Sequence, residues 1–257
     1  MSSIFVIAPT PPGTGICCYR SRVTNEARTK RLIQTNPINN VGRLAKSNYK
    51  KREILSIEEL RILFPKDEQE LLLVWKSYDL AALYFLLLTS GICSGEARAL
   101  LWKSVLWDEQ AILIIQAVKG GNEIGIPKGG DKRGIIVPSR TIDLLNKWRM
   151  KSMYKNEEDF VFPGQNGDKP LGKEAVSKNF IKGIKRAGID ITGRNIVAHS
   201  LRHTYNTIMK GILTAEVLRE FTGHRSEAMT KRYDNPQLID RLRQFHDSIK
   251  DIDNTWK

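Results

Sequence analysis

Residues 199–233 carry the most informative pattern in the chain, which reads His199-Ser200-Leu201-Arg202-His203, then Thr222-Gly223-His224, then Tyr233. His199 and Arg202 lie three positions apart, so on a helix both side chains would project towards one anionic group. Tyr233 follows His224 by nine residues. The set combines an imidazole base, a guanidinium, a second imidazole and a phenol. These are the groups that attack on a phosphodiester requires.

The charge of the chain points to a polyanionic partner. The 257 residues carry a net charge of +13, and the sequence pI is about 9.7. A field of that sign favours polyanions, and the release of counterions would strengthen binding to nucleic acid at low salt. The first 50 residues hold eight Lys/Arg and one acid, Glu26, which is a net charge of +7. We therefore expect residues 1–50 to form a basic arm that contacts DNA phosphates.

Other compositional features favour an intracellular soluble protein. Hydrophobic residues make up 41% and charged residues 27% of the chain, as in ordinary globular proteins. The three cysteines (Cys17, Cys18 and Cys93) have the pattern of neither a disulfide framework nor a metal-binding pair. The short apolar run at residues 2–9 has no preceding positive charge, so we expect no secretion signal. The apolar run at residues 80–88 is too short to span a bilayer. We expect a cytoplasmic protein that has no membrane partner.

The periodicity of the chain predicts a mainly α fold with a small three-stranded antiparallel β-sheet. Ser56 and Glu59 have the spacing of a capping box, which predicts the start of a helix. Further helices are expected over residues 78–90, 94–102 and 139–150. Extended runs are expected over residues 111–118, from the Gly120-Gly121 turn to Ile126, and over 134–137, with a short piece at 160–163.

Several segments, together with the motifs quoted above, resemble the tyrosine recombinase (phage integrase) family. They read Asn36-Pro37-Ile38, Arg52-Glu53-Ile54-Leu55-Ser56, Glu96-Ala97-Arg98-Ala99-Leu100-Leu101-Trp102, Pro127-Lys128-Gly129-Gly130 and Val161-Phe162-Pro163. The resemblance implies a catalytic domain over residues 51–244, which is roughly three quarters of the chain. Residues 1–50 would then be the remnant of a truncated core-binding domain with its linker, and residues 245–257 a C-terminal tail.

The resemblance also implies a reaction, which is site-specific recombination or integration of DNA for a phage or mobile element. The Tyr233 oxygen would attack the DNA phosphorus and leave a 3′-phosphotyrosyl link and a free 5′ hydroxyl, with no metal or other cofactor. Arg202 would stabilise the nonbridging oxygens. His199 would act as a base or proton shuttle, and His224 would donate a hydrogen bond to the phosphate. Lys128 would protonate the leaving 5′ oxygen.

The DNA contacts expected from the resemblance extend beyond this catalytic set. Lys119 and Lys132 lie near Lys128 in the sequence and compete with it for the role of the acid. The residues predicted to bind DNA are Arg43, Lys46, Lys50, Lys51, Lys132 and Arg133. The partner would be double-stranded DNA, and the chain would act on it as a homo-oligomer, a synaptic tetramer.

Cys93 is a departure from the family pattern. The family places its first catalytic arginine in a turn that here reads Ser90-Gly91-Ile92-Cys93-Ser94-Gly95-Glu96, so Cys93 occupies the arginine position. A thiol offers no permanent cation and at most a weak donor, whereas arginine has five N–H donors. Arg98 cannot easily replace the lost group, because five helical positions place it roughly 140° away. We expect Cys93 to impair cleavage and to leave Glu96 without its usual partner.

Two alternatives remain open at the level of the sequence. The chain could be a catalytically inactive relative of the integrases that only binds DNA. Cys93 and the short N-terminal region before Lys51 favour this alternative. His199 and His203, four residues apart, could instead bind a metal together with Cys93. Arg202 would then lie beside the cation, and the glutamate of the H-E-x-x-H zinc motif is absent, which disfavours the metal site.

Overall fold

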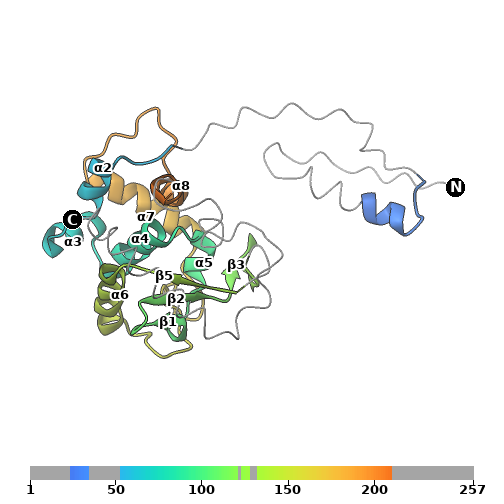
Figure 1. Ribbon diagram of the computed structural model, residues 1–257, viewed down its shortest axis with the longest axis horizontal. Coiled ribbons are helices and arrows are strands. Elements are labelled where there is room, and N and C mark those ends of the chain that lie inside the picture. Colours follow the sequence, from blue (N-terminus) through green and yellow to red (C-terminus); the bar gives the residue numbers. More distant parts are fainter. Residues whose placement is uncertain (1–23, 35–52, 121–122, 128–131, 210–257) are drawn as a thin grey trace. The chain divides into compact units, whose positions relative to one another are not determined.

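The computed structural model describes residues 24–34, 53–120, 123–127 and 132–209 (Figure 1). The chain divides into two compact units, Met1–Lys50 and Lys51–Lys257. In the first unit, residues 24–29 are helical. The second unit contains every other helix and strand that the structure describes, and these follow the mainly α order predicted above.

Seven α-helices are described in the second unit: α2 (Ile57–Leu63), α3 (Glu68–Trp75), α4 (Tyr78–Ser90), α5 (Ser94–Arg98), α6 (Ser139–Lys151), α7 (Lys173–Arg186) and α8 (Ala198–Met209). A 3₁₀ turn, η2 (Trp102–Ser104), follows α5. The capping box predicted for α2 is confirmed. The Glu59 N–H donates to Ser56 Oγ at 3.2 Å, and the Ser56 N–H donates to Glu59 Oε2 at 2.8 Å. These two bonds satisfy backbone donors that a helix start otherwise leaves unpaired.

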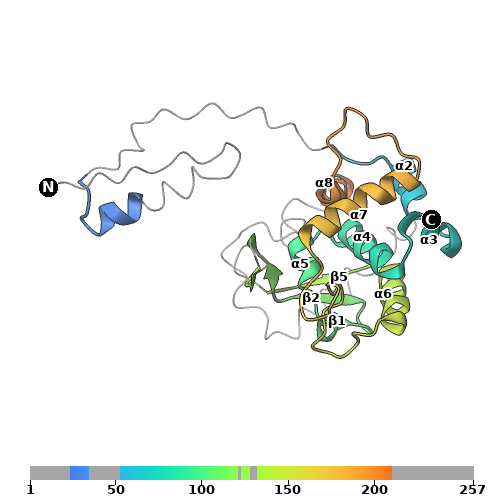
Figure 2. The ribbon, with the colours of Figure 1, turned by 180° about the vertical axis from the view of Figure 1, so that it is seen from behind.

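Helix α4 is the centre of the core. Eleven of its thirteen residues are buried, and it packs against α3, α5, α6 and α8 (Figures 1 and 2). A helix that is apolar on all sides must be enclosed by other elements, and that is its situation here. In the described part of the chain no single helix has the length and apolarity to cross a membrane. The bent pair α3 and α4, 93° apart, passes that test by length and composition only.

An aromatic cluster joins α7 to the N-terminal helices of the second unit. Its members are Phe64, Trp75, Tyr84, Phe85 and Phe180. Neighbouring ring centroids lie 4.5–6.4 Å apart, the range in which aromatic pairs attract each other. Gly183 permits this close approach, because a Cβ there would come within 2.4 Å of the Trp75 ring. The cluster therefore fixes α7, the helix that leads into α8.

A three-stranded antiparallel sheet lies beside the helices, as predicted, but residues 105–106 form one of its strands in place of the predicted run that ends at Ile126. Its strand order is β1 (Val105–Leu106), β2 (Ala111–Ile114) and β5 (Arg133–Ile136). Two further strands, β3 (Ala117–Val118) and β4 (Ile124–Gly125), pair with each other in a separate antiparallel hairpin. The apolar run at residues 111–118 is therefore two strands rather than the single one expected. The break coincides with Gln116, whose side-chain amide turns away to donate to the Ala99 carbonyl at 2.8 Å.

The predicted helix over residues 94–102 is also shorter than expected and ends at Arg98. The residues that follow it pair with a distant segment instead of continuing the helix. The Val161 N–H donates to the Leu100 carbonyl at 2.8 Å, and the Trp102 N–H donates to the Asp159 carbonyl at 3.1 Å. The short extended piece predicted at residues 160–163 takes part in this pairing through the bridge between Leu101 and Phe160.

Candidate active site

Helix α8 carries the first motif, and its start is set by a local hydrogen-bond exchange. The Val197 N–H donates to Ser200 Oγ at 3.2 Å, and the Ser200 N–H donates to the Val197 carbonyl at 2.7 Å. On the helix, the rings of His199 and His203 meet edge to face with centroids 5.0 Å apart. Arg202 is buried, whereas His199 and His203 are half-buried. The helical placement predicted for His199 and Arg202 is therefore confirmed.

Arg202 is anchored to the turn that ends α4. Its Nη1 donates to the Gly91 carbonyl at 2.7 Å in a buried contact. Gly91 has a φ of +63°, the left-handed conformation that suits glycine. A Cβ at this position would lie 2.3 Å from the Tyr205 ring, so a residue with a side chain does not fit without a shift. Burial raises the pKa of the Tyr205 phenol to about 12, against the opposing charge of Arg202. Tyr205 is thus a packing residue here, held as a neutral phenol.

Cys93 lies in the same turn, two residues after the carbonyl that Arg202 binds. It is half-buried, and its N–H donates to Glu96 Oε2 at 2.8 Å. Residues 91–93, which we call the catalytic turn, are therefore held at both ends, by Arg202 at Gly91 and by Glu96 at Cys93. The structure brings the position of the expected arginine and the Arg202 guanidinium together at this turn.

Glu96 has a partner, contrary to expectation. Its two carboxylate oxygens accept hydrogen bonds from Nη1 and Nη2 of Arg133 at 2.9 and 2.8 Å. Both side chains are buried, at 6% exposure for Arg133 and 5% for Glu96. The expectation that Glu96 would be left without a partner is therefore wrong. A guanidinium fork from strand β5 meets this carboxylate in the bidentate geometry that the two groups favour.

The same contact places Arg133 differently from the DNA-binding role predicted for it. Arg133 is buried, and both of its Nη atoms donate to the Glu96 carboxylate, the partner that a buried charge requires. Lys132, the preceding residue, is exposed, as a phosphate contact would need. Arg98 is likewise held away from the catalytic turn. It is buried, and its Nε donates to the Leu171 carbonyl.

Several predicted site residues lie outside the residues that the structure describes. They are Tyr233, His224 and Lys128 of the catalytic set, and Arg43, Lys46, Lys50 and Lys51 of the DNA-binding set. Their roles stay predictions. Within the described ranges, no group of three or more His, Cys, Asp or Glu side chains is arranged to hold a metal ion.

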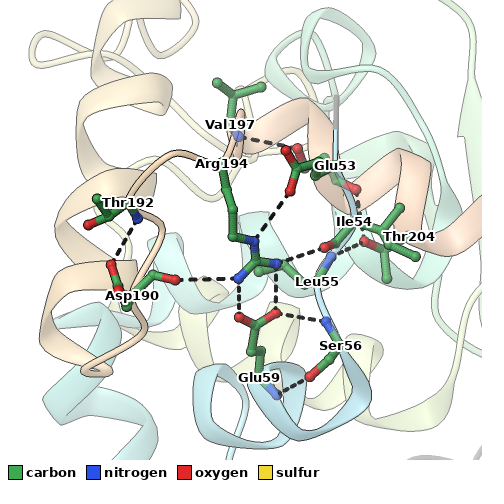
Figure 3. Close-up of polar contacts among 11 residues, drawn as sticks. Glu53, Ile54, Leu55, Ser56, Glu59, Asp190, Thr192, Arg194, Val197 and Thr204 are labelled. Carbon is green, nitrogen blue, oxygen red and sulfur yellow. Dashed lines mark hydrogen bonds and ion pairs between the residues drawn. The ribbon is translucent and has the colours of Figure 1, made fainter. Parts of the chain in front are cut away.

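Arg194 does not stand out in the sequence, although it makes a dense set of polar contacts near the start of α8 (Figure 3). It binds Glu53, Glu59 and the carbonyl of Ile54, all of which lie about 140 positions earlier in the chain. Sequence spacing gives no signal for a contact of that range. The polar run Thr192-Gly193-Arg194 before the motif helix is the one available hint.

Comparison with known sequences places the chain in a family. The sequence model of the Phage integrase family matches residues 61–238, more than half of the chain. The chain therefore belongs to the phage integrase family, the tyrosine recombinases. It is also 26% identical over 159 residues to the prophage integrase IntS of Escherichia coli (strain K12). That match covers 61% of this chain and 37% of the relative, so the chain spans little more than a third of that protein.

Solved structures agree on the fold. The Tn1549 transposon integrase in complex with a circular intermediate DNA superposes with a TM-score of 0.61 at 17% identity, covering 81% of this chain and 70% of that one. A lambda integrase dimer bound to a core site gives a TM-score of 0.55 at 19% identity, covering 83% and 72%. The XerA recombinase gives 0.51 at 18% identity, covering 90% and 83%. The fold described above is that of the tyrosine recombinase catalytic domain.

Proposed function

We propose that this chain cuts and rejoins double-stranded DNA at specific sites through Tyr233, as an enzyme of DNA recombination or integration. The observation that carries the proposal is the placement of His199 and Arg202 on α8 beside the catalytic turn, in a member of the phage integrase family. In this reaction the Tyr233 oxygen bonds to phosphorus as the bond to the 5′ oxygen breaks. The link stores the energy of the broken bond, so rejoining needs no cofactor.

The described residues support distinct parts of this chemistry. One N–H of Arg202 is held by the Gly91 carbonyl, and we assign the guanidinium to the nonbridging oxygens of a phosphate bound beside the catalytic turn. A phenol has a pKa of about 10, so attack by Tyr233 requires a base, which we assign to His199. His224 would donate a hydrogen bond to the phosphate, and Lys128 would give its proton to the leaving 5′ oxygen.

The partners follow from charge and from the solved relatives. A net charge of +13 suits double-stranded DNA, with phosphate contacts from the basic arm and from Lys132. The lambda integrase has been solved as a tetramer bound to a Holliday junction. We propose a comparable homo-oligomer for this chain, a synaptic tetramer assembled on DNA in the cytoplasm.

A second candidate function is DNA binding without cleavage, and Cys93 is the observation that favours it. A thiol at the position of the first catalytic arginine removes one fixed cation from the reacting phosphate. Loss of one preorganised donor costs about 10²–10³ in rate at a comparable site. Binding would survive, because many phosphate contacts share that energy.

A covalent-capture assay separates the two functions. The protein is incubated with a library of nicked duplexes of randomised sequence. In these the short fragment that bears the free 5′ hydroxyl diffuses away after cleavage, so the covalent intermediate cannot be rejoined and accumulates. An adduct that survives denaturing gel electrophoresis and disappears in Tyr233→Phe supports the enzyme. Retention of DNA in a gel shift, with no adduct from the wild type or from Cys93→Arg, would assign the chain to binding alone.

A further inference from the structure

Arg194 lies in the connection between α7 and α8, four residues before α8 begins. Its guanidinium reaches the segment that leads into α2, residues 53–56, which we call the lead-in segment. Nη2 donates to the Ile54 carbonyl at 3.0 Å, and Nε lies 3.6 Å from Glu53 Oε2. Nη1 and Nη2 both donate to the Glu59 carboxylate, the second at 3.1 Å (Figure 3). One side chain therefore joins two parts of the sequence that are far apart.

The Glu59 carboxylate takes part in two interactions, the capping box of α2 and the ion pair with Arg194. Its carboxylate accepts the Ser56 N–H of the capping box and also receives the Arg194 fork. The hydrogen bond from Arg194 holds the pKa of Glu59 below its ordinary value, and the same bond raises the pKa of Arg194. A carboxyl group with a lowered pKa is ionised at neutral pH. The ion pair is thus intact there and weakens only as acid protonates Glu59.

The lead-in segment also touches α8 directly. The Leu55 N–H donates to Thr204 Oγ1 at 3.1 Å, and Thr204 Oγ1 donates to the Ser200 carbonyl at 3.0 Å. Leu55 itself is buried, so this contact is shielded from water. Thr204 lies two residues after Arg202. Helix α8 is therefore held on one side by the lead-in segment and on the other by the Gly91 carbonyl that Arg202 binds.

We propose that Arg194 is a positioning residue, which sets the places of His199 and Arg202 by fastening the start of α8 to the lead-in segment. The connection from α7 is also tied to the lead-in segment by a longer backbone hydrogen bond, in which the Glu53 N–H donates to the Asn195 carbonyl at 3.5 Å. A displacement of about 1 Å at reacting groups can cost roughly a hundredfold in rate. The effect on cleavage rests on the function proposed above, whereas the effect on the two histidines does not.

Two substitutions isolate the ion pair from other roles of these residues. Arg194→Met removes the guanidinium and keeps much of its apolar stem. Glu59→Gln removes the charge, and glutamine still completes a capping box, so the start of α2 is preserved. Arg149→Met is a matched control: Arg149 is an arginine with the same 28% side-chain exposure, and it is paired at 2.7 Å with Glu157 on the α6 side of the molecule.

The primary readout is the set of NMR signals of the histidine rings through a pH titration, assigned by replacing each of the four histidines in turn. Arg194→Met should shift the His199 and His203 signals and their titration midpoints, and Glu59→Gln should shift them in the same direction. The double variant should match Arg194→Met alone, because the Arg194–Glu59 ion pair is already absent from that variant. Arg149→Met should leave the two signals in place even if it lowers Tm.

The second readout is adduct formation in a Cys93→Arg background. Arg194→Met should slow it by about tenfold to a hundredfold and change DNA affinity by less than about twofold. Unchanged histidine signals in a folded Arg194→Met protein would overturn the proposal. If that variant does not fold, Arg194→Lys and Glu59→Gln test the proposal through the same signals, and unchanged signals in both would overturn it equally. Shifted signals with no adduct from any protein would keep the positioning role and reject the recombinase function instead.

Discussion

Glu96 explains how the catalytic turn keeps its shape without an arginine at position 93. One of its oxygens accepts the Cys93 N–H, and both oxygens receive the Arg133 fork. The charge of this buried carboxylate is thus balanced by strand β5 rather than by the turn itself. The catalytic turn and the sheet therefore form one rigid unit, and Arg202 takes its anchor from that unit.

The first prediction concerns the cost of breaking this buried pair. Glu96→Gln should lower the free energy of unfolding by about 3–5 kcal/mol, because it leaves the Arg133 charge buried and unbalanced. Glu158→Gln is the control, since the Lys103–Glu158 pair is exposed and should contribute at most about 1 kcal/mol. Urea unfolding of the three proteins measures both values. Equal losses in the two variants would contradict the structural role given to Glu96.

The second prediction concerns the effect of Cys93 on DNA cleavage. Cys93→Arg should raise adduct formation by at least about a hundredfold and change DNA affinity little, because the added charge acts at one phosphorus. Cys93→Lys should recover less, since an ammonium lacks the guanidinium fork. Covalent capture and gel shifts on the same DNA measure the two effects. Equal adduct yields from the wild type and Cys93→Arg, with both bound to DNA, would show that Cys93 is not the lesion.

The helix bounds that depend on neighbouring residues were predictable from the sequence. The capping box of α2 and the bounds of α4 follow from neighbouring residues and are confirmed, and α6 ends within one residue of its predicted end. The predictions that went wrong depend on distant partners. Helix α5 stops early because residues 100–102 pair with residues 159–161, and the run at 111–118 breaks where Gln116 reaches Ala99.

The same distinction holds for the candidate site. The spacing of His199 and Arg202 was sufficient to predict a common helix, because it concerns one turn of that helix. The ion pair of Arg133 with Glu96 joins positions 37 apart, and that of Arg194 with Glu59 joins positions 135 apart. Composition and periodicity carry no information on such pairs, which arise only once the sheet and the helices have packed together.

The third prediction tests the packing of α8 on the end of α4. Gly91→Ala should destabilise the protein by about 1–3 kcal/mol for overpacking against Tyr205, in addition to about 1–2 kcal/mol for the left-handed backbone. Gly188→Ala is the matched control, because Gly188 has a φ of +70° and open space around its Cβ position. The difference between the two losses in chemical unfolding measures the overpacking alone. If Tyr205→Ala does not reduce the cost of Gly91→Ala, the clash with that ring is not its source.

Two features of the whole chain bear on DNA binding and assembly: the distribution of charge and the sequence of the C-terminal residues. The net charge of +7 in residues 1–50 leaves +6 for the other 207, so DNA affinity should depend strongly on the arm and on salt. At the other end, residues 236–257 lie outside the described part of the chain. Their sequence has apolar residues at helical spacing: Leu238, Ile239, Leu242, Phe245 and Ile249.

The fourth prediction follows from that C-terminal stripe. An apolar helical face must be buried against something, and we expect it to dock on a catalytic domain, its own or that of a neighbouring copy. Deletion of residues 237–257 should therefore lower Tm or change the oligomeric state, as measured by light scattering. Deletion of residues 252–257, which lie beyond the stripe, is the control. A full deletion with neither effect would refute the docking.

The two contacts described for the catalytic turn involve main-chain atoms, the Gly91 carbonyl and the Cys93 N–H. Main-chain groups are the same whichever side chain position 93 carries. These two main-chain contacts are therefore available when another side chain stands at position 93. Cysteine and arginine codons differ by as little as one nucleotide, so a single point mutation is enough to place a guanidinium at this turn.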